Sequence, residues 1–410
     1  MFRTSVIIIG GGQAGLAMSH CLTRRGVDHV VLERGRVGER WRSERWDGLR
    51  LLTPNWMTRL PGRAYDGPDP DGFMTMAEVV RFLEDYAASG ACPVETAVSV
   101  RSVTRRAYGR YRVETSHGAW EAPAVVIATG MCGVPLIPPL SAALPDDIDQ
   151  LTPTAYRNPS MVRGGGVLVV GASASGLQLA EDLARAGRAV TLAVGRHIRL
   201  PRRYLGRDIL WWFDRMGTLT QPAHAVPDLD RARRQPSMQL VGRPDHASLD
   251  LGTLMDLGVR LAGRAGAVEA GGQMAFADDL PETMAAADAR MARLLGGIDT
   301  FAGTTGARPR PLAAPDAPTR LDLRAEGIET VLWATGFRRD YSWLHVPVLD
   351  AAGEIIHDGG VTPAPGLVVL GLRFLRHRSS NFIGGVGRDA EALADHLVRH
   401  LATVRRVVAA

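Results

Sequence analysis

One short pattern occurs twice in this chain and limits its possible folds more than any other feature. Residues 6–15 read VIIIGGGQAG and residues 167–176 read VLVVGASASG, so an apolar run ends in a glycine-rich turn at two places 161 positions apart. A β-branched run of this kind suits a strand that is buried on both faces of a parallel sheet. A glycine-rich turn that follows such a strand and opens a helix can cradle the phosphates of a dinucleotide. The repeat therefore predicts an α/β protein with two Rossmann-like dinucleotide-binding domains.

The first copy of the pattern has the complete glycine fingerprint. Gly10, Gly12 and Gly15 have the spacing GxGxxG, and the residues after them read as a helix that ends near Gly26. One glycine permits the sharp turn, one lets backbone N–H groups approach a pyrophosphate, and one lets the helix pack close to the sheet. The next strand, HVVLE, ends in Glu33, where a carboxylate can accept hydrogen bonds from a ribose. We expect this cradle to bind the ADP half of FAD.

The second copy differs at its centre and at the end of its second strand. Gly171 and Gly176 keep the outer positions, whereas Ser173 replaces the middle glycine, and its small hydroxyl can still lie beside a pyrophosphate. The second strand, AVTLAV, ends without an acid and continues as GRHIRLPRR. The arginines of that continuation are Arg196, Arg199, Arg202 and Arg203. Guanidinium groups bind a 2′-phosphate that a carboxylate would repel, so we expect NADPH rather than NADH.

Composition excludes several classes of protein. At 410 residues the chain is long enough for two or three domains, and its 48 basic residues are all arginine. The absence of lysine from the sequence excludes a Walker-type phosphate loop and Schiff-base chemistry. Cys21, Cys92 and Cys132 form no CxxC pair, so neither a zinc site nor a redox-active disulfide is predicted. The arginines are interleaved with acids, so we expect no nucleic-acid partner. No apolar run nears the roughly 20 residues that would span a membrane, so we expect no membrane partner. We expect a cytoplasmic protein without a metal site.

Several stretches beyond the glycines resemble the flavin-containing monooxygenases and the plant auxin-biosynthesis flavin monooxygenases. They are GERW (38–41), RWDGLRLLTP (45–54), the strands VVIATG and VLWATGF, and the segments GLVVLGL and FIGGVGRDAEALADHL. Together these stretches cover most of the chain except roughly residues 210–325. The resemblance implies that an NADPH-binding domain (161–339, with an insertion at about 205–300) interrupts an FAD-binding domain made of residues 1–160 and 340–410. In this family each Ala-Thr-Gly end marks a crossing between the two domains.

The resemblance also implies which residues contact the cofactors. Those that join the first glycine motif and Glu33 at FAD are Gln13, Ala14, Arg34, Arg40, Trp41, Thr53, Val98, Ala128, Thr129 and Gly130. Those at NADPH are Gly171, Ser173, Ala174, Ser175, Gly176, Arg196, Arg202, Ala334, Thr335 and Gly336. Arg378 and Asn381 precede the last helix, where the family places the flavin edge. An arginine there could stabilise negative charge on the reduced flavin, and an asparagine could hold a peroxide.

Two departures from the family pattern keep the function open. The stretch DDIDQLTPTAY keeps only Tyr156 of the monooxygenase fingerprint and has Thr152 where the family has histidine. The family's asparagine or histidine beneath the flavin aligns with Leu52. Both departures favour an NADPH-linked flavin reductase or dehydrogenase that passes electrons to a quinone or a protein acceptor. A non-catalytic flavin-bound redox sensor or transporter accessory is a third alternative.

Our first hypothesis is an enzyme, an NADPH-dependent flavoprotein monooxygenase. In this family NADPH reduces FAD, and the reduced FAD captures O₂ as a C4a-hydroperoxide that oxidises a small-molecule substrate. The chain's remaining features add little to the choice of function. Trp211 and Trp212 could line a substrate tunnel or a homodimer contact, but core packing is the simpler interpretation. His246 and His377 are weak candidates for acid–base groups.

Smaller patterns predict further local structure. Thr75 and Glu78 have the spacing of a capping box before a helix whose apolar face includes Phe82 and Tyr86. Residues 258–278 read as strand, turn and strand, and Asp279 precedes a helix that we expect to end near residue 295. The sequence GARPRPLAAPDAP has the composition of a surface loop.

Overall fold

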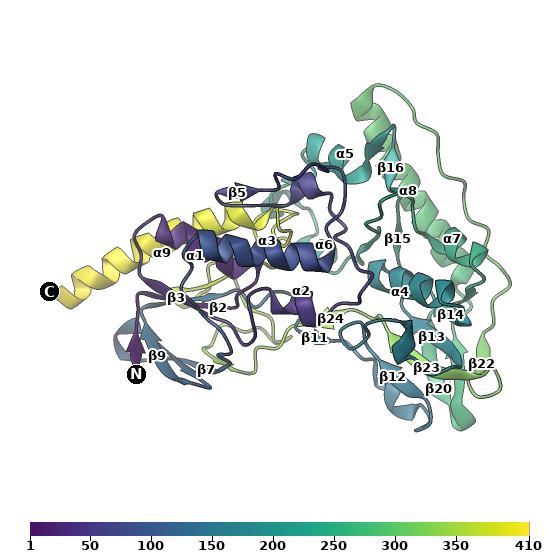
Figure 1. The fold of residues 1–410 in the computed structure, drawn as a ribbon, viewed down its shortest axis with the longest axis horizontal. Coiled ribbons are helices and arrows are strands. Elements are labelled where there is room, and N and C mark those ends of the chain that lie inside the picture. The colour runs from purple at the N-terminus through teal and green to yellow at the C-terminus, as the bar shows by residue number, and fades with distance from the viewer. Residues whose placement is uncertain (410) are drawn as a thin grey trace.

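The computed structural model describes residues 1–409, except for the side chains of residues 108, 405 and 407–409. The chain forms two lobes that lie side by side along the long axis of the molecule (Figure 1). Each lobe is built on a five-stranded sheet in which all neighbouring strands are parallel. The predicted fold class, an α/β protein with two Rossmann-like domains, is confirmed.

The sheet of the first lobe joins strands from both ends of the chain. Its order is β26 (Leu367–Val369), β10 (Ala124–Ile127), β2 (Val6–Ile9), β3 (His29–Leu32) and β6 (Val94–Glu95). The sheet of the second lobe has the order β12 (Asp149–Leu151), β23 (Ile328–Trp333), β13 (Gly166–Val170), β14 (Val190–Ala193) and β19 (Arg260–Ala262). In each sheet the strand before the glycine-rich turn, β2 or β13, is central. The division into domains at residues 160 and 340 stays a prediction, because the topology alone does not test its exact limits.

The remaining elements surround these two sheets. The helices are α1 (Gln13–Thr23), α2 (Glu39–Ser43), α3 (Met76–Ser89), α4 (Ala174–Arg185), α5 (Ile209–Arg215), α6 (Leu229–Arg233), α7 (Leu251–Asp256), α8 (Leu280–Ala302) and α9 (Val386–Ala409). A mixed sheet contains β1 (Phe2–Arg3), β9 (Gly118–Ala122), β8 (Tyr111–Thr115), β7 (Val100–Arg105) and β25 (Leu344–His345). A three-stranded antiparallel sheet contains β20 (Ala265–Glu269), β21 (Gln273–Phe276) and β22 (Arg320–Asp322). Short strand pairs are β4 (Arg59–Leu60) with β5 (Arg63–Ala64), β11 (Val134–Pro135) with β24 (Phe337–Arg338), β15 (Ile198–Arg199) with β18 (Met238–Gln239), and β16 (Arg203–Tyr204) with β17 (Arg207–Asp208).

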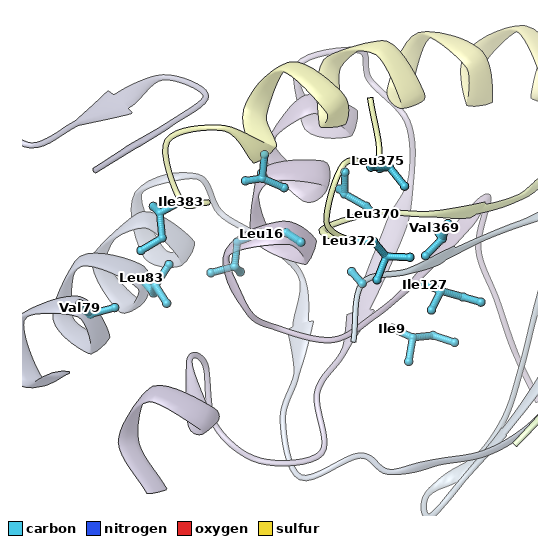
Figure 2. Packing of buried hydrophobic residues seen from close by; sticks show 14 of the residues in the cluster. Ile9, Leu16, Val79, Leu83, Ile127, Val369, Leu370, Leu372, Leu375 and Ile383 are labelled. Atoms are coloured by element: carbon cyan, nitrogen blue, oxygen red, sulfur yellow. The ribbon is translucent and has the colours of Figure 1, made fainter. Parts of the chain in front are cut away.

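The core of the first lobe explains why its central strands are apolar throughout. β2 and β10 are buried along their whole length, because helices cover one face of the sheet and the mixed sheet packs near the other. Leu16 on α1, Leu83 on α3 and Leu372 after β26 converge on this core (Figure 2). α9 packs along α1, so the last helix of the chain closes the domain that the first strand begins.

Most of the local predictions are confirmed. Thr75 and Glu78 form the predicted capping box at the start of α3, and Phe82 and Tyr86 are buried. Residues 258–278 contain three strands, β19, β20 and β21, where the sequence predicted two. α8 continues to Ala302, beyond the predicted end near residue 295. Trp212 is buried in an apolar cluster of the second lobe, as core packing requires. Among residues 1–409, no helix is long and apolar enough to cross a membrane.

Candidate functional site

The two glycine-rich turns have nearly the same backbone shape at their first glycine. The φ angle is +113° at Gly10 and +108° at Gly171, a region that residues with a Cβ rarely adopt. A Cβ on Gly10 would lie 2.6 Å from the carbonyl oxygen of Ala128, and one on Gly171 would lie 2.6 Å from that of Ala334. Both first positions therefore require glycine for two independent reasons.

The last glycine of each turn, Gly15 or Gly176, is required even more strictly. A Cβ on Gly15 would lie 1.8 Å from the carbonyl oxygen of Gly10, and a Cβ on Gly176 would lie 1.7 Å from that of Gly171. These contacts are with backbone atoms, which cannot rotate away as a side chain can. The close approach brings the starts of α1 and α4 against the ends of β2 and β13.

The middle position of the first turn is open, which is the property that a bound phosphate needs, and the matching Ser173 of the second turn is half-buried. A Cβ on Gly12 would meet no atom within 4 Å, and neither Gly12 nor Ser173 caps its helix with a side-chain hydrogen bond. The first N–H groups of α1 and α4 therefore face space with the positive end of the helix dipole. The residues of both turns fit the pyrophosphate of a dinucleotide.

The two Ala-Thr-Gly segments lie directly behind the two turns. The Ala128 N–H donates to Ile9 at 2.9 Å, and the Ala334 N–H donates to Val170 at 2.9 Å. The strands that leave these segments, β11 and β24, pair with each other in antiparallel fashion. Thr335 also donates a hydrogen bond to the carbonyl oxygen of Leu136. The sequence pattern that predicted two crossings between the lobes thus corresponds to one paired connection.

The acid at the end of β3 holds the first turn. Glu33 accepts hydrogen bonds from the N–H of Gly11 at 2.6 Å and from the N–H of Gly35 at 2.9 Å. Each carboxylate oxygen has a further lone pair, so Glu33 can also accept from a ligand hydroxyl. The backbone N–H of Val98 donates to the Glu33 carbonyl at 2.9 Å, which brings this predicted residue to the same edge.

The other predicted FAD residues fall into two groups. Trp41 donates from its indole to Gln13 across 3.4 Å, and Arg40 donates to the carbonyl oxygen of Cys132, so these side chains lie beside the first turn. Burial lowers the pKa of the Arg40 guanidinium, an effect that Glu44 opposes. Arg34, by contrast, is exposed and pairs with Glu44 at 2.8 Å. Thr53 is half-buried in the segment that follows Leu52.

The second turn is held by a residue that the sequence did not reveal. The position that matches Glu33 is Val194, which is completely buried. Its aliphatic side chain cannot form a hydrogen bond with the turn. Instead the side-chain amide of Gln239 donates to the carbonyl oxygen of Ala172 at 2.8 Å. Gln178 of α4 donates in turn to the carbonyl oxygen of Leu240 at 3.0 Å. Because Gln239 lies 67 residues beyond Ala172, no local spacing rule could have found it.

The predicted arginine cluster is divided by the structure. Arg196 is exposed just after β14, as a residue that recognises a phosphate should be. Arg199 is buried and pairs with Asp250 at 2.9 Å and Asp288 at 2.5 Å. It also donates to the carbonyl oxygen of Arg310 at 3.0 Å, so it serves as an internal tie.

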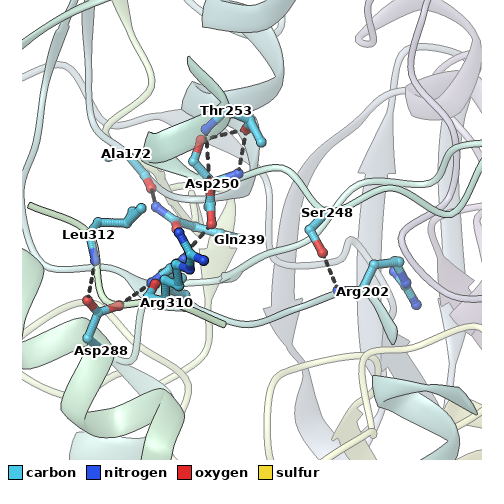
Figure 3. A network of polar contacts seen from close by, with 10 residues as sticks. Ala172, Arg202, Gln239, Ser248, Asp250, Thr253, Asp288, Arg310 and Leu312 are labelled. Atoms are coloured by element: carbon cyan, nitrogen blue, oxygen red, sulfur yellow. Dashed lines mark hydrogen bonds and ion pairs between the residues drawn. The ribbon is translucent and has the colours of Figure 1, made fainter. Parts of the chain in front are cut away.

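The surroundings of Arg202 do not agree with the prediction that this residue binds NADPH. Its side chain is only 1% exposed. Nε donates to Asp208 Oδ2 at 2.7 Å and Nη1 donates to the carbonyl oxygen of Leu52 at 2.8 Å, whereas Nη2 lies 2.5 Å from the same Asp208 oxygen without a hydrogen bond. Figure 3 shows its guanidinium directed away from Asp250 and Asp288. The charge is buried and already neutralised, so it is not available to a surface phosphate.

The two predicted catalytic residues lie in the loop before α9. Arg378 is half-buried above the Phe374 ring at 4.9 Å and donates to the side chain of Gln221 at 2.7 Å. Burial lowers the pKa of this guanidinium. Asn381 is half-buried three residues later. Both positions are compatible with a role at the flavin edge, which stays a prediction.

The histidines do not form a metal centre. His377 is buried between Asp389, at 3.2 Å from Nε2, and Ser379, at 3.2 Å from Nδ1. His246 is half-buried against the Phe73 ring. Within residues 1–409 no group of three or more His, Cys, Asp or Glu side chains could hold a metal ion.

Comparisons with known proteins agree with this geometry. Residues 7–203 match the model of the pyridine nucleotide-disulphide oxidoreductase family. An uncharacterized CzcO-like oxidoreductase of Geobacillus kaustophilus is 33% identical over 96% of this chain and 98% of its own length. The probable indole-3-pyruvate monooxygenase YUCCA4 of Arabidopsis thaliana is 29% identical over 52% of this chain and 54% of its own length. A flavin-containing monooxygenase from Stenotrophomonas maltophilia has a similar structure, with a TM-score of 0.69, 21% identity, and coverage of 98% of this chain and 99% of that one.

Proposed function

Because the chain belongs to the family of the CzcO-like oxidoreductases, with the fold of the flavin-containing monooxygenases, we propose that it is an FAD- and NADPH-dependent monooxygenase that acts on a small molecule. The observation that carries the proposal is the pair of glycine-rich turns, which have the same backbone shape at their first glycine and opposite surroundings. An acid, Glu33, stands at the first turn, whereas an exposed arginine, Arg196, follows the strand at the second.

The first turn would hold FAD. The N–H groups at the start of α1 would bind its pyrophosphate, Glu33 would accept from a ribose hydroxyl, and Gln13 and Trp41 would lie beside it. Bound FAD supplies two-electron transfer and the capacity to activate oxygen. Arg378, at the loop before α9, would contribute positive charge near developing negative charge on the ring.

The second turn would hold NADPH. The N–H groups at the start of α4 would bind its pyrophosphate, and Arg196 would bind the 2′-phosphate. The paired crossings β11 and β24 join the backs of both turns, which supports a fixed distance between the two nucleotides. Such a fixed distance is what hydride transfer between two bound rings requires.

A reductase is the second candidate, and one observation favours it. Leu52 occupies the position of the family's polar residue beneath the flavin, and an aliphatic side chain cannot hydrogen-bond to a reacting oxygen species. Thr152, in place of the family's histidine, bonds only to the neighbouring Thr154 hydroxyl at 3.0 Å among the described side chains. An NADPH-linked enzyme that delivers electrons to a quinone would need neither side chain.

The experiment that separates these candidates starts with the purified protein and FAD. We expect a yellow protein whose flavin is reduced by NADPH without oxygen and reoxidised when O₂ is added. A thioether, an amine, a cyclic ketone and a 2-oxo acid would then be supplied with ¹⁸O₂, and the products examined by mass spectrometry. Label in one product, with less H₂O₂ released per NADPH, supports the monooxygenase. Release of all the oxygen as H₂O₂, with faster turnover on a quinone, overturns it in favour of the reductase.

A further inference from the structure

We propose that Arg202 is a positioning residue that transmits the placement of the second lobe to the backbone segment expected beneath the flavin. The inference rests on the proposed function, since it concerns the alignment of the two bound nucleotides. Arg202 lies in the second lobe, between β15 and β16, yet its guanidinium bonds to Leu52 of the first lobe. It therefore joins the two halves of the site through a single side chain.

The contacts of Arg202 give it one fixed orientation. Nε and Nη2 both contact Asp208 Oδ2, at 2.7 and 2.5 Å, while Nη1 donates to the Leu52 carbonyl at 2.8 Å. The guanidinium also stacks above the Phe73 ring at 4.8 Å, which is a second contact with the first lobe. The backbone N–H of Arg202 donates to Ser248 at 2.9 Å, so its own end of the link is held as well.

The charge of Arg202 is buried, so the contacts of its guanidinium matter for the stability of the ion pair. Burial lowers the pKa of the Arg202 guanidinium, and the carboxylate of Asp208 opposes that effect. A buried charge needs acceptors for its N–H groups. The Leu52 carbonyl accepts from Nη1, whereas Nη2 lies 2.5 Å from Asp208 Oδ2 and has no hydrogen-bond partner among the described residues. The Leu52 carbonyl is therefore the acceptor that the guanidinium has outside the ion pair, and its position is coupled to the pair.

The segment that receives this bond is otherwise held within the first lobe. The N–H of Leu51 donates to Met74 at 2.8 Å, and the N–H of Asn55 donates to Gly72 at 2.9 Å. The second lobe contributes one more close contact, because a Cβ on Gly242 would lie 2.1 Å from the carbonyl oxygen of Leu51. Two carbonyls in succession, those of Leu51 and Leu52, therefore face the second lobe.

The Leu52 side chain is aliphatic, so Leu52 can interact with the second lobe in a polar way only through its backbone. The Arg202 bond uses the Leu52 carbonyl in that way. Loss of the bond should shift the segment without removing any group that binds either nucleotide.

The test uses two variants of the full-length protein and one control. Arg202→Met together with Asp208→Asn removes the ion pair without leaving an unpaired buried charge, and the introduced asparagine side chain can still cap α5 as the Asp208 carboxylate does now. Arg202→Lys keeps the charge but loses the planar fork. Arg260→Met is the matched control, because Arg260 is an exposed arginine of the second lobe whose guanidinium donates to Glu326 at 2.8 Å.

We expect the double variant to reduce FAD with NADPH at a limiting rate about tenfold lower, since small misplacements of reacting groups have large effects. The dissociation constants for NADPH and FAD should change less than about twofold, and the NADPH-to-NADH preference should not change, because no phosphate contact is lost. Arg202→Lys should recover part of the rate, and Arg260→Met should match the unaltered protein.

Hydrogen exchange provides a readout that needs no cofactor. The amides of Leu51 and Asn55 should exchange about tenfold faster in the double variant, because their segment has lost its link to the second lobe. Unchanged exchange at these amides would overturn the proposal. A loss of NADPH preference would overturn it too, since Arg202 would then be a phosphate ligand. If the unaltered protein took no hydride from NADPH, the proposed function would fail, and the exchange result would still decide the role of Arg202.

Discussion

The two glycine-rich turns have the same backbone shape, but different side chains hold them in place. At the first turn the Glu33 carboxylate accepts a hydrogen bond from the N–H of Gly11. At the second turn the Gln239 amide donates a hydrogen bond to the carbonyl oxygen of Ala172, the residue that matches Gly11. A negative group thus stands at one cradle and a neutral group at the other. Only the second cradle can accept an additional phosphate without repulsion.

The two supports also differ in where they come from in the chain. Glu33 ends the strand next to the first turn, so the first cradle is assembled from consecutive elements. Gln239 belongs to a segment that also packs on the first lobe, where Gly242 lies against the Leu51 carbonyl. The first cradle is therefore a local structure, whereas the second depends on how the two lobes meet.

The change with the largest expected effect replaces the last glycine of each turn. Gly15→Ala and Gly176→Ala place a methyl group within 2 Å of a backbone carbonyl oxygen in the present geometry. We expect either change to lower the free energy of unfolding by roughly 2–4 kcal/mol, because the backbone must move to accept it. Thermal unfolding and the FAD content of the purified protein measure both effects. Gly15→Ala should give a colourless protein, and Gly176→Ala a yellow protein that NADPH does not reduce.

Gly12→Ala is the control for these two changes. Its Cβ meets no atom within 4 Å, so the melting temperature should stay the same while the affinity for FAD falls. A Gly12→Ala protein as unstable as Gly15→Ala would contradict the assignment of the open position to a ligand. A Gly176→Ala protein that loses FAD would show that the two cradles are not separate sites.

The second test addresses the charge at the second cradle. Arg196→Ala should weaken NADPH binding by roughly tenfold to a hundredfold, because a charge-assisted bond to the 2′-phosphate is lost. NADH has no such phosphate, so its affinity should change little. Stopped-flow reduction of the flavin at several concentrations of each nucleotide measures the two dissociation constants. Equal losses for NADPH and NADH would remove the 2′-phosphate from the interpretation.

Sequence reasoning predicted the parts of the fold that depend on local backbone rules. The glycines of both turns and the capping box of α3 follow from spacing along one strand or helix. Glu33 belongs to the same group, because it follows directly from the end of β3. These features could be predicted because each involves residues or elements that are close together in the chain.

The sequence was misleading where contacts join distant segments. Four arginines within eight residues were expected to form one basic surface, yet Arg199 and Arg202 are buried against acids from elsewhere in the chain or a neighbouring strand. No composition rule separates an arginine that faces solvent from one that is buried with a carboxylate. Gln239 was missed for the same reason, since its partner Ala172 lies 67 residues away.

The smallest test concerns that missed residue and decides whether the second turn really depends on it. Gln239→Ala removes one neutral hydrogen bond and leaves the Ala172 carbonyl without its partner, so we expect NADPH and NADH both to bind roughly 3–10-fold more weakly. The effect should be equal for the two nucleotides and absent for FAD, because the bond shapes the turn and touches no phosphate. Within the described residues the side-chain oxygen of Gln239, Oε1, has no hydrogen-bond partner. The side-chain NH₂ group therefore accounts for the whole effect. Gln178→Ala, which loosens the same segment at Leu240 without contacting the turn, is the matched control. If Gln178→Ala weakened the binding of both nucleotides as much as Gln239→Ala does, the packing of the segment would be responsible. The conclusion that Gln239 holds the second turn would then be wrong.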